Sequence, residues 1–162
     1  MKPKPEHIAQ ICEKGHLIVS SIKDHPNFQS PFCEKCGSST ITGCKNCDWP
    51  IRGRGPYSWM ADSGPFQPPK FCGECGTAFP WTQAIVDAAR SLTDEQNTLT
   101  ADEKATMKTS IDQMTSDTAL TPVAVSKFKT LATKIGPQAG EMLKSLVLAV
   151  ATGEAKRHLG LP

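Results

Sequence analysis

The first half of the chain contains four closely spaced pairs of residues of the kinds that bind metal ions. Two cysteines two positions apart can reach one ion from a single tight turn, and four such ligands make a closed, structural zinc site. The four pairs use all seven cysteines and predict two Zn²⁺ ions. The pairs are Cys12-x3-His16, Cys33-x2-Cys36, Cys44-x2-Cys47 and Cys72-x2-Cys75.

The eighth ligand must be a histidine, and His16 is the best candidate. It follows Gly15, and glycine permits the turn that brings the imidazole back toward Cys12. His7 and His25 are the alternatives. Because His25 precedes Pro26 in a polar loop, we rank it second.

The four pairs can share two ions in three ways. We expect an interleaved arrangement, in which the second and fourth pairs hold one ion and the first and third hold the other. Both the second and the fourth pair are followed by a glycine, Gly37 and Gly76, and would form a symmetric ribbon site. A sequential arrangement is nearly as good. The nested arrangement is the least favourable, because it closes a short loop together with a very long one.

The chain divides into two parts of different composition. Nine of its ten aromatic residues lie between Phe28 and Trp81, which leaves only Phe128 in the second half. We therefore predict an α+β protein in two parts: a small, β-rich, zinc-stabilised double ribbon at residues 1–80, and an α-helical bundle of about four helices at residues 81–162.

Helical periodicity begins after Trp81. We expect helices at about 82–92, from the capping box Thr100-x-x-Glu103 to about 114, at 121–135, and at 137–158. The last helix is apolar on most sides between Met142 and Ala151, so it is expected to be buried by its neighbours or to form an oligomer interface.

No segment predicts export or membrane insertion. The N-terminus lacks the apolar stretch of a signal peptide, and the stretch from Met142 to Ala151 is too short to span a bilayer. Paired cysteines without an export signal favour metal binding in a reducing cytoplasm over disulfides.

The formal charge of +2 does not by itself indicate nucleic-acid binding. Seven thiolates and two Zn²⁺ ions would change the net charge to −1, since a bound ion's charge belongs in the count. A basic patch formed by Lys45, Arg52, Arg54 and Lys70 remains a candidate for phosphate contacts.

These motifs together resemble a bacterial family of zinc-ribbon proteins known only as a domain of unknown function. The resemblance runs from Ile8 to Trp81 and more loosely into the helical tail. It rests on the order of the four pairs, on the glycines at 15, 37 and 76, and on Pro80-Trp81. It implies that the eight residues are metal ligands and that the C-terminal portion is helical.

We expect a non-enzymatic interaction module. The sequence contains no metalloprotease, deaminase, phosphate-loop or serine-nucleophile motif. The loop from Trp49 to Phe71 would present Tyr57, Trp59 and Phe66 to a partner protein, unless these rings only cover the metal sites. The alternatives are nucleic-acid binding through the basic patch, with base stacking on Trp49 or Tyr57, and an enzyme with an open zinc site.

Overall fold

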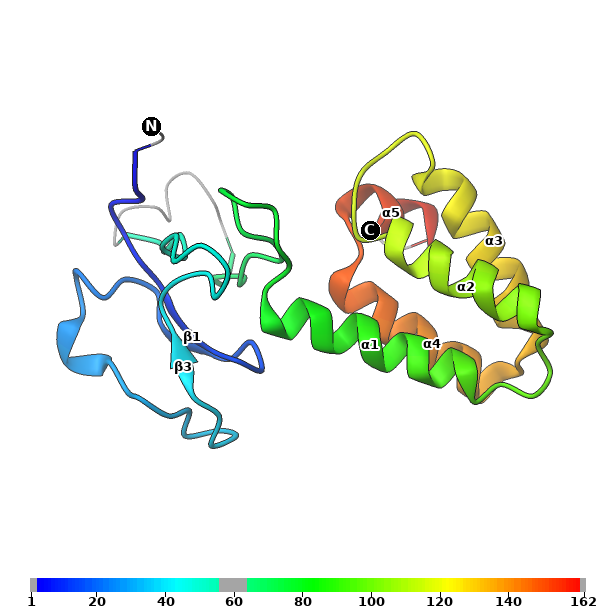
Figure 1. The fold of residues 1–162 in the computed structure, drawn as a ribbon, viewed down its shortest axis with the longest axis horizontal. Coiled ribbons are helices and arrows are strands. Elements are labelled where there is room, and N and C mark those ends of the chain that lie inside the picture. Colours follow the sequence, from blue (N-terminus) through cyan, green and yellow to red (C-terminus); the bar gives the residue numbers. More distant parts are fainter. Residues whose placement is uncertain (1–2, 56–63, 161–162) are drawn as a thin grey trace. The chain divides into compact units, whose positions relative to one another are not determined.

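The computed structural model describes residues 3–55 and 64–160 and divides into two compact units, Met1–Gln83 and Ala84–Pro162. The division falls within helix α1 (Pro80–Asp94). Strands and cysteine-rich turns precede the helices, so the predicted α+β layout in two parts is confirmed (Figure 1). In the described part of the chain, no helix is long and apolar enough to cross a membrane.

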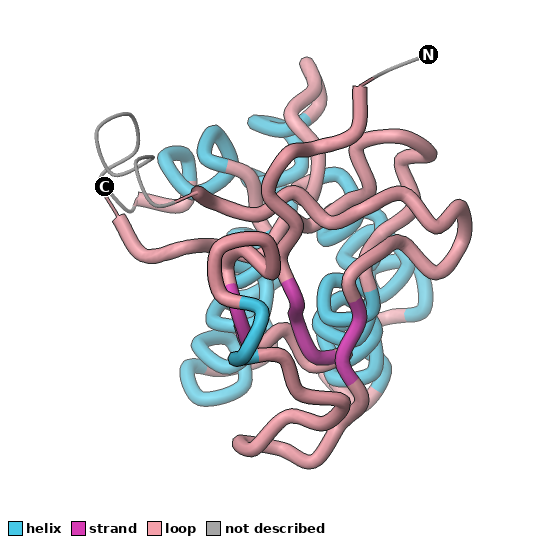
Figure 2. Tube along the Cα trace, turned by 90° about the vertical axis from the view of Figure 1, so that its left-hand side faces the viewer, coloured by secondary structure: helices cyan, strands magenta, loops and turns pink. Residues whose placement is uncertain are grey.

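The N-terminal unit contains a three-stranded antiparallel sheet in the order β2-β1-β3. Strand β1 (Gln10–Cys12) is central, between β2 (Leu17–Val19) and β3 (Thr40–Ile41). In its register with β3, Ile11 lies opposite Ile41 and Cys12 lies opposite Thr40. Figure 2 shows that these strands are short. A four-residue turn joins β1 to β2, and a long loop joins β2 to β3. A 3-10 helix, Pro26–Phe28, lies in the loop between β2 and β3.

The core of this unit is small and includes two of the candidate metal ligands. Ile11, Ile51 and Phe79 are almost completely buried, and Cys44 and Cys72 lie in the same cluster. Small domains bury too little apolar surface to be stable without staples such as disulfides or metal ions. This unit is therefore of the kind that bound metal ions commonly stabilise.

The C-terminal unit is built from helices. After α1 come α2 (Ala101–Gln113), α3 (Thr121–Lys134), α4 (Pro137–Val150) and α5 (Gly153–His158). The expected capping box begins α2: the Thr100 hydroxyl accepts from the Glu103 amide, and the Glu103 carboxylate accepts from the Thr100 amide. Helix α1 begins two residues before the expected position, because Pro80 has the fixed φ of a first helical residue.

The prediction of one continuous helix over residues 137–158 is wrong, because the segment forms two helices, α4 and α5. Ala151 has an extended backbone, with ψ of 147°, which ends α4. Thr152 then caps α5 by accepting from the Ala155 amide, and its own amide donates to the carbonyl of Met114. The chain breaks here because a threonine before a helical turn can satisfy that turn's free amides.

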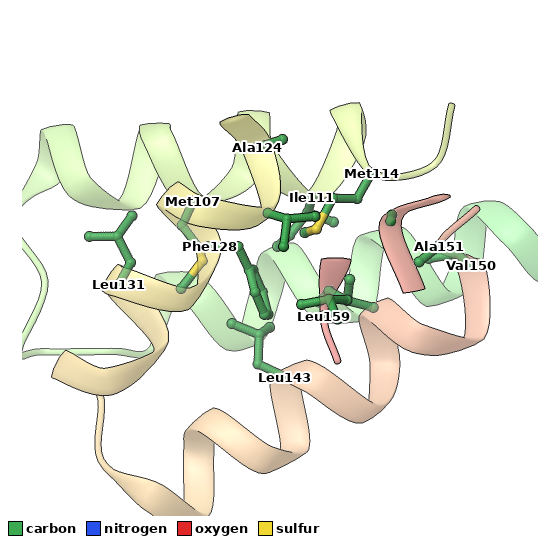
Figure 3. Close-up of a cluster of buried hydrophobic side chains, with 14 of the residues drawn as sticks. Met107, Ile111, Met114, Ala124, Phe128, Leu131, Leu143, Val150, Ala151 and Leu159 are labelled. Carbon is green, nitrogen blue, oxygen red and sulfur yellow. The ribbon is translucent and has the colours of Figure 1, made fainter. Parts of the chain in front are cut away.

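The helical core surrounds the ring of Phe128, which is 1% exposed (Figure 3). The expected apolar stripe, Met107 and Ile111 of α2 and Met114 directly after it, is fully buried in the same cluster. Helix α4 buries Leu143, Val147 and Val150 in the same cluster and therefore contributes to the intramolecular core. The oligomer interface expected on this helix stays a prediction.

The capping box gives a testable pH dependence. The ion pair with Lys134, together with the Thr100 amide, lowers the pKa of Glu103. Such a carboxylate stabilises the fold above its unfolded pKa of about 4.3, and the contribution is lost as the pH falls through the lower folded pKa. We expect Glu103→Gln to lower the thermal midpoint of helix unfolding at pH 7 and to have little effect at pH 3. Circular dichroism measures this midpoint.

The exposed Glu95 provides the control. Glu95→Gln should shift the midpoint little at either pH. An equal loss of stability in Glu103→Gln at pH 7 and pH 3 would contradict the assigned role of the carboxylate.

Candidate metal centre

All eight predicted ligands lie in two groups of four. Within each group the candidate ligand atoms lie within 4.8 Å of one another. The first and second pairs form one group, and the third and fourth form the other. The groups are group 1, Cys12, His16, Cys33 and Cys36, and group 2, Cys44, Cys47, Cys72 and Cys75.

The arrangement is thus sequential, and the interleaved arrangement that we favoured is wrong. Strand pairing explains the difference. Because Cys12 lies opposite Thr40 and the Glu13 amide donates to the carbonyl of Ser39, the β1–β3 ladder places the first pair beside the second. Cys44 and Cys72 are both buried in the core beneath Phe79 and Ile51, which brings the third pair to the fourth.

Group 1 combines three sulfurs with one imidazole nitrogen. The Nδ1 atom of His16 lies 3.5 Å from the sulfur of Cys12 and 3.6 Å from that of Cys33. The sulfurs of Cys12 and Cys36 are 3.7 Å apart. The His16 amide also donates to the Cys12 sulfur at 3.2 Å, an interaction that favours the thiolate. The imidazole therefore faces the same centre as the sulfurs.

Group 2 consists of four sulfurs. Those of Cys44 and Cys75 are 3.7 Å apart, and those of Cys47 and Cys72 are 3.6 Å apart. A disulfide would bring two sulfurs to about 2.05 Å, and all seven cysteines of the described part are free thiols. In this group Cys44 and Cys72 are buried, while Cys47 and Cys75 are exposed.

The three CxxC pairs have the same turn. In each, the residue after the second cysteine donates its amide to the carbonyl of the first, at 2.7 to 3.0 Å. That residue has a positive φ: 69° for Gly37, 72° for Gly76 and 56° for Asp48. Aspartate is one of the few residues that occupy this region at modest cost. The two glycines led us to single out two similar turns, and Asp48 makes the third.

The turn before His16 explains why Gly15 and Trp81 occur together in this chain. Gly15 has φ of 89°, and a Cβ atom there would lie 3.0 Å from the Cβ of Trp81. Trp81 is held by its indole, which donates to the carbonyl of Pro69 at 2.9 Å, and by stacking on Phe79 at 4.8 Å. A side chain at position 15 would displace the tryptophan or move His16.

The two alternative histidines lie elsewhere. Nδ1 of His7 lies 2.9 Å from the Asp24 carboxylate and 3.1 Å from the Ser21 hydroxyl. Both partners contact the same ring nitrogen, whereas a catalytic triad uses one nitrogen for each, so this cluster ties the N-terminal arm to the following loop. His25 is exposed and packs edge-on against Phe28.

Two sulfurs have environments that favour the thiolate. Hydrogen bonds from the hydroxyl and amide of Ser38 lower the pKa of Cys36 to about 6. The hydroxyl and amide of Thr77 lower the pKa of Cys75 to about 5. Each group thus contains an exposed sulfur whose hydrogen bonds favour the thiolate, the form that binds a metal ion.

Neighbouring sulfurs oppose further ionisation. Burial raises the pKa of Cys12. The Trp49 amide acts to lower the pKa of Cys47, but partial loss of solvent around the sulfur and the adjacent Cys75, Cys72 and Cys44 thiols raise it to about 12. Crowded thiols resist becoming thiolates together because like charges repel. A divalent cation at the centre removes this conflict, and its binding would release protons.

Other predicted binding residues are placed only in part. Trp49 and Phe66 pack against the core of the N-terminal unit. Tyr57 and Trp59 lie outside the described residues. In the basic patch, Lys45 forms an ion pair with Glu13.

The other three basic residues of that patch also interact with other parts of the chain. Arg54 donates to the carbonyl of Gly64, and Lys70 has a partner of its own. Arg52 is exposed and pairs through its backbone with Ile8. The patch is therefore not a set of four uncommitted cations.

The short sheet, the three CxxC turns and the two groups of four converging side chains define a zinc-ribbon-like protein with two candidate metal sites and a helical unit. The chain belongs to a bacterial family described as "Uncharacterized protein conserved in bacteria (DUF2321)", whose profile matches residues 6–159. The resemblance seen in the motifs is confirmed, and the match also covers the helices. Comparison with curated proteins and with solved structures found no match.

The ligand assignment predicts a selective effect on metal content. His16→Ala removes a ligand from group 1 only. Loss of a hydrogen bond that supports a ligand already weakens metal binding by about 10- to 100-fold. Loss of the ligand itself should therefore weaken the binding of one of the two metal ions by at least about 100-fold. Native mass spectrometry with a competing chelator measures this loss. His25→Ala is the matched control and should retain both ions. Equal retention in the two variants would remove His16 from the ligand set.

Proposed function

We propose that this protein is a non-enzymatic module in which two structural Zn²⁺ ions hold the N-terminal unit and present a surface to a partner protein. The observation that supports the metal part is the convergence of four ligand atoms in each group. The proposal requires a reducing compartment such as the cytoplasm, because the thiols must remain free to bind metal.

Zinc fits the donor atoms and their spacing. Thiolates and imidazole are ligands that tetrahedral zinc prefers. With Zn–S bonds of about 2.3 Å and Zn–N bonds of about 2.0 Å, tetrahedral geometry separates two sulfurs by about 3.8 Å and a sulfur from a nitrogen by about 3.5 Å. The sulfur pairs lie at 3.6 to 3.7 Å and the sulfur–nitrogen pairs at 3.5 to 3.6 Å.

The complete ligand sets support a structural role over a catalytic one. Catalytic zinc keeps an open position beside three protein ligands, whereas structural zinc has four. With His16 as the fourth ligand of group 1, each group would supply four ligands, which favours a closed site over one with the open position that an enzyme would need. Because the core of the unit is small, a metal ion would have a stabilising role even without catalysis.

A surface beside group 1 supports partner binding. Phe28 and Phe32 are 70% and 62% exposed, and they line a hollow of about 200 Å³ with Leu17 and Ile18. Large apolar side chains gathered at an exposed hollow are typical of interaction sites. This surface differs from the expected one, since Trp49 and Phe66 of the predicted loop pack against the core.

The loop that carries these rings is anchored. The Gln10 side chain, which is 7% exposed, donates to the carbonyl of Ser30 and accepts from its amide. The Thr40 hydroxyl donates to the same carbonyl. Phe32 is held further by bridge pairing with Ser39. A surface held in one conformation loses less entropy when a partner binds.

The nucleic-acid alternative has less support. Of the four basic residues proposed for it, Lys45 is neutralised by Glu13. Trp49, proposed to stack on bases, is partly buried against the core. A protein partner agrees better with an exposed apolar hollow than a phosphate backbone does.

Removal of the metal should affect the two units differently. Structural zinc contributes an apparent folding free energy of about 10 to 16 kcal/mol per site. A strong chelator should release two Zn²⁺ ions per chain and unfold the N-terminal unit, seen as a change in tryptophan fluorescence, because all three tryptophans precede residue 82. The helical circular dichroism should persist. Concerted loss of both signals would argue against separately stable units.

Partner binding is tested by capture from a lysate of the source bacterium, followed by measurement with the purified partner. Phe28→Ser with Phe32→Ser should weaken the complex at least about tenfold, since aromatic anchors typically contribute more than about 1 kcal/mol each. Leu120→Ser with Val123→Ser is the matched control, because these exposed apolar residues lie in the helical unit. Equal binding by both double variants, or binding that nuclease abolishes, would contradict the proposal.

A further inference from the structure

The helical unit contains a hollow that the metal sites do not involve. It has a volume of about 520 Å³ and is lined by residues of α3 and α4 and by Leu159 after α5. Sites for small molecules commonly measure about 300 to 1,000 Å³. All of its lining residues belong to the C-terminal unit.

Small residues create this hollow. Helices α3 and α4 are joined only by Ile135 and Gly136, and Ala132, Gly136 and Gly140 line the space between them. A Cβ atom on Gly140 would lie 3.0 Å from the carbonyl of Ala132, so the two backbones approach closely there. None of these three residues has a side chain large enough to fill the space between the helices.

The floor of the hollow is apolar. The lining residues Phe128 and Leu159 are 1% and 7% exposed. Figure 3 shows Phe128, Leu143 and Leu159 gathered between the helices. Such a floor favours an aliphatic group over a polar one, because burying apolar surface is the main driving force for ligand binding in such pockets.

The rim provides a lysine from each helix. Lys129 of α3 donates from Nζ to the carbonyl of His158 at 2.6 Å, a neutral acceptor. Lys144 of α4 has its Nζ 3.8 Å from the Glu141 carboxylate, a loose contact that exposed pairs of this kind gain little from. Both lysines line the hollow, as does Glu141, so two positive charges and one negative charge leave the rim with a net charge of +1.

Charge is unevenly distributed along the helical half. Residues 81–120 contain three basic and seven acidic residues, a net charge of −4, whereas residues 121–162 contain six basic and two acidic residues, a net charge of +4. Lys134 of the second set is paired with Glu103 of α2. The segment that forms the hollow is therefore the cationic part of the unit, which favours anionic ligands.

We propose that this hollow binds a single-chain anionic amphiphile, with its aliphatic tail over Phe128 and Leu159 and its anionic head between Lys129 and Lys144. The apolar floor accounts for the tail, and the two lysines account for the charge of the head. This function is separate from zinc binding and from the surface around Phe28.

The proposal is tested with the full zinc-loaded chain and sodium dodecanoate kept below its micelle concentration. Calorimetry should show one binding site, and backbone NMR shifts should centre on Ala132, Gly136 and Gly140. Dodecyltrimethylammonium has the same tail with a cationic head and should bind at least about tenfold more weakly. Lys129→Glu and Lys144→Glu should each weaken dodecanoate binding about tenfold.

The matched control is Lys127→Glu, which makes the same charge change at an exposed position of α3 outside the hollow. It should bind dodecanoate as the wild type does. Thermal unfolding of each variant by circular dichroism shows that the fold is retained. Absence of dodecanoate binding, equal binding of the cationic amphiphile, or equal weakening by the control would each overturn the proposal. Binding confined to anionic vesicles would overturn it as well and indicate a membrane surface instead.

Discussion

The N-terminal unit depends on the crowding of four ligand atoms at each of two centres. Sulfurs 3.6 to 3.7 Å apart cannot all carry a negative charge without a cation between them. The hydrogen bonds at Cys36 and Cys75 already favour thiolates, while burial disfavours one at Cys12. A divalent ion resolves that opposition, and the short strands and small core around it have little else to hold them together.

The two units are packed differently because of this constraint. The cysteine-rich unit has a small core and leaves Phe28 and Phe32 on its surface. The helical unit has a continuous apolar core around Phe128. Its own irregularity lies where Gly136 and Gly140 leave space between α3 and α4. Each unit thus has a surface that its own packing does not fill.

Much of the architecture could be predicted from residue spacing. The eight candidate ligands, the capping box at Thr100 and the start of α3 depend on neighbours a few positions away, which a sequence displays directly. The choice of which pairs meet depends on the β1–β3 ladder instead. Loop-closure entropy distinguishes the sequential and interleaved arrangements by only about 0.6 kcal/mol, so the likeness of two glycine-ended turns was a misleading guide. The third turn was missed because its left-handed residue is Asp48 and not a glycine.

The sequential arrangement also has a consequence for how the protein is made. Every ligand of group 1 lies before residue 37, and every ligand of group 2 lies after residue 43. On a ribosome, the first set emerges complete while the second is still being synthesised, and chains emerge at about 5 to 20 residues per second. In an interleaved arrangement no set of four would be complete before Cys47, whereas group 1 is complete at Cys36. Here the first ion can be captured early, so that nascent thiols spend less time open to oxidation or to mispairing.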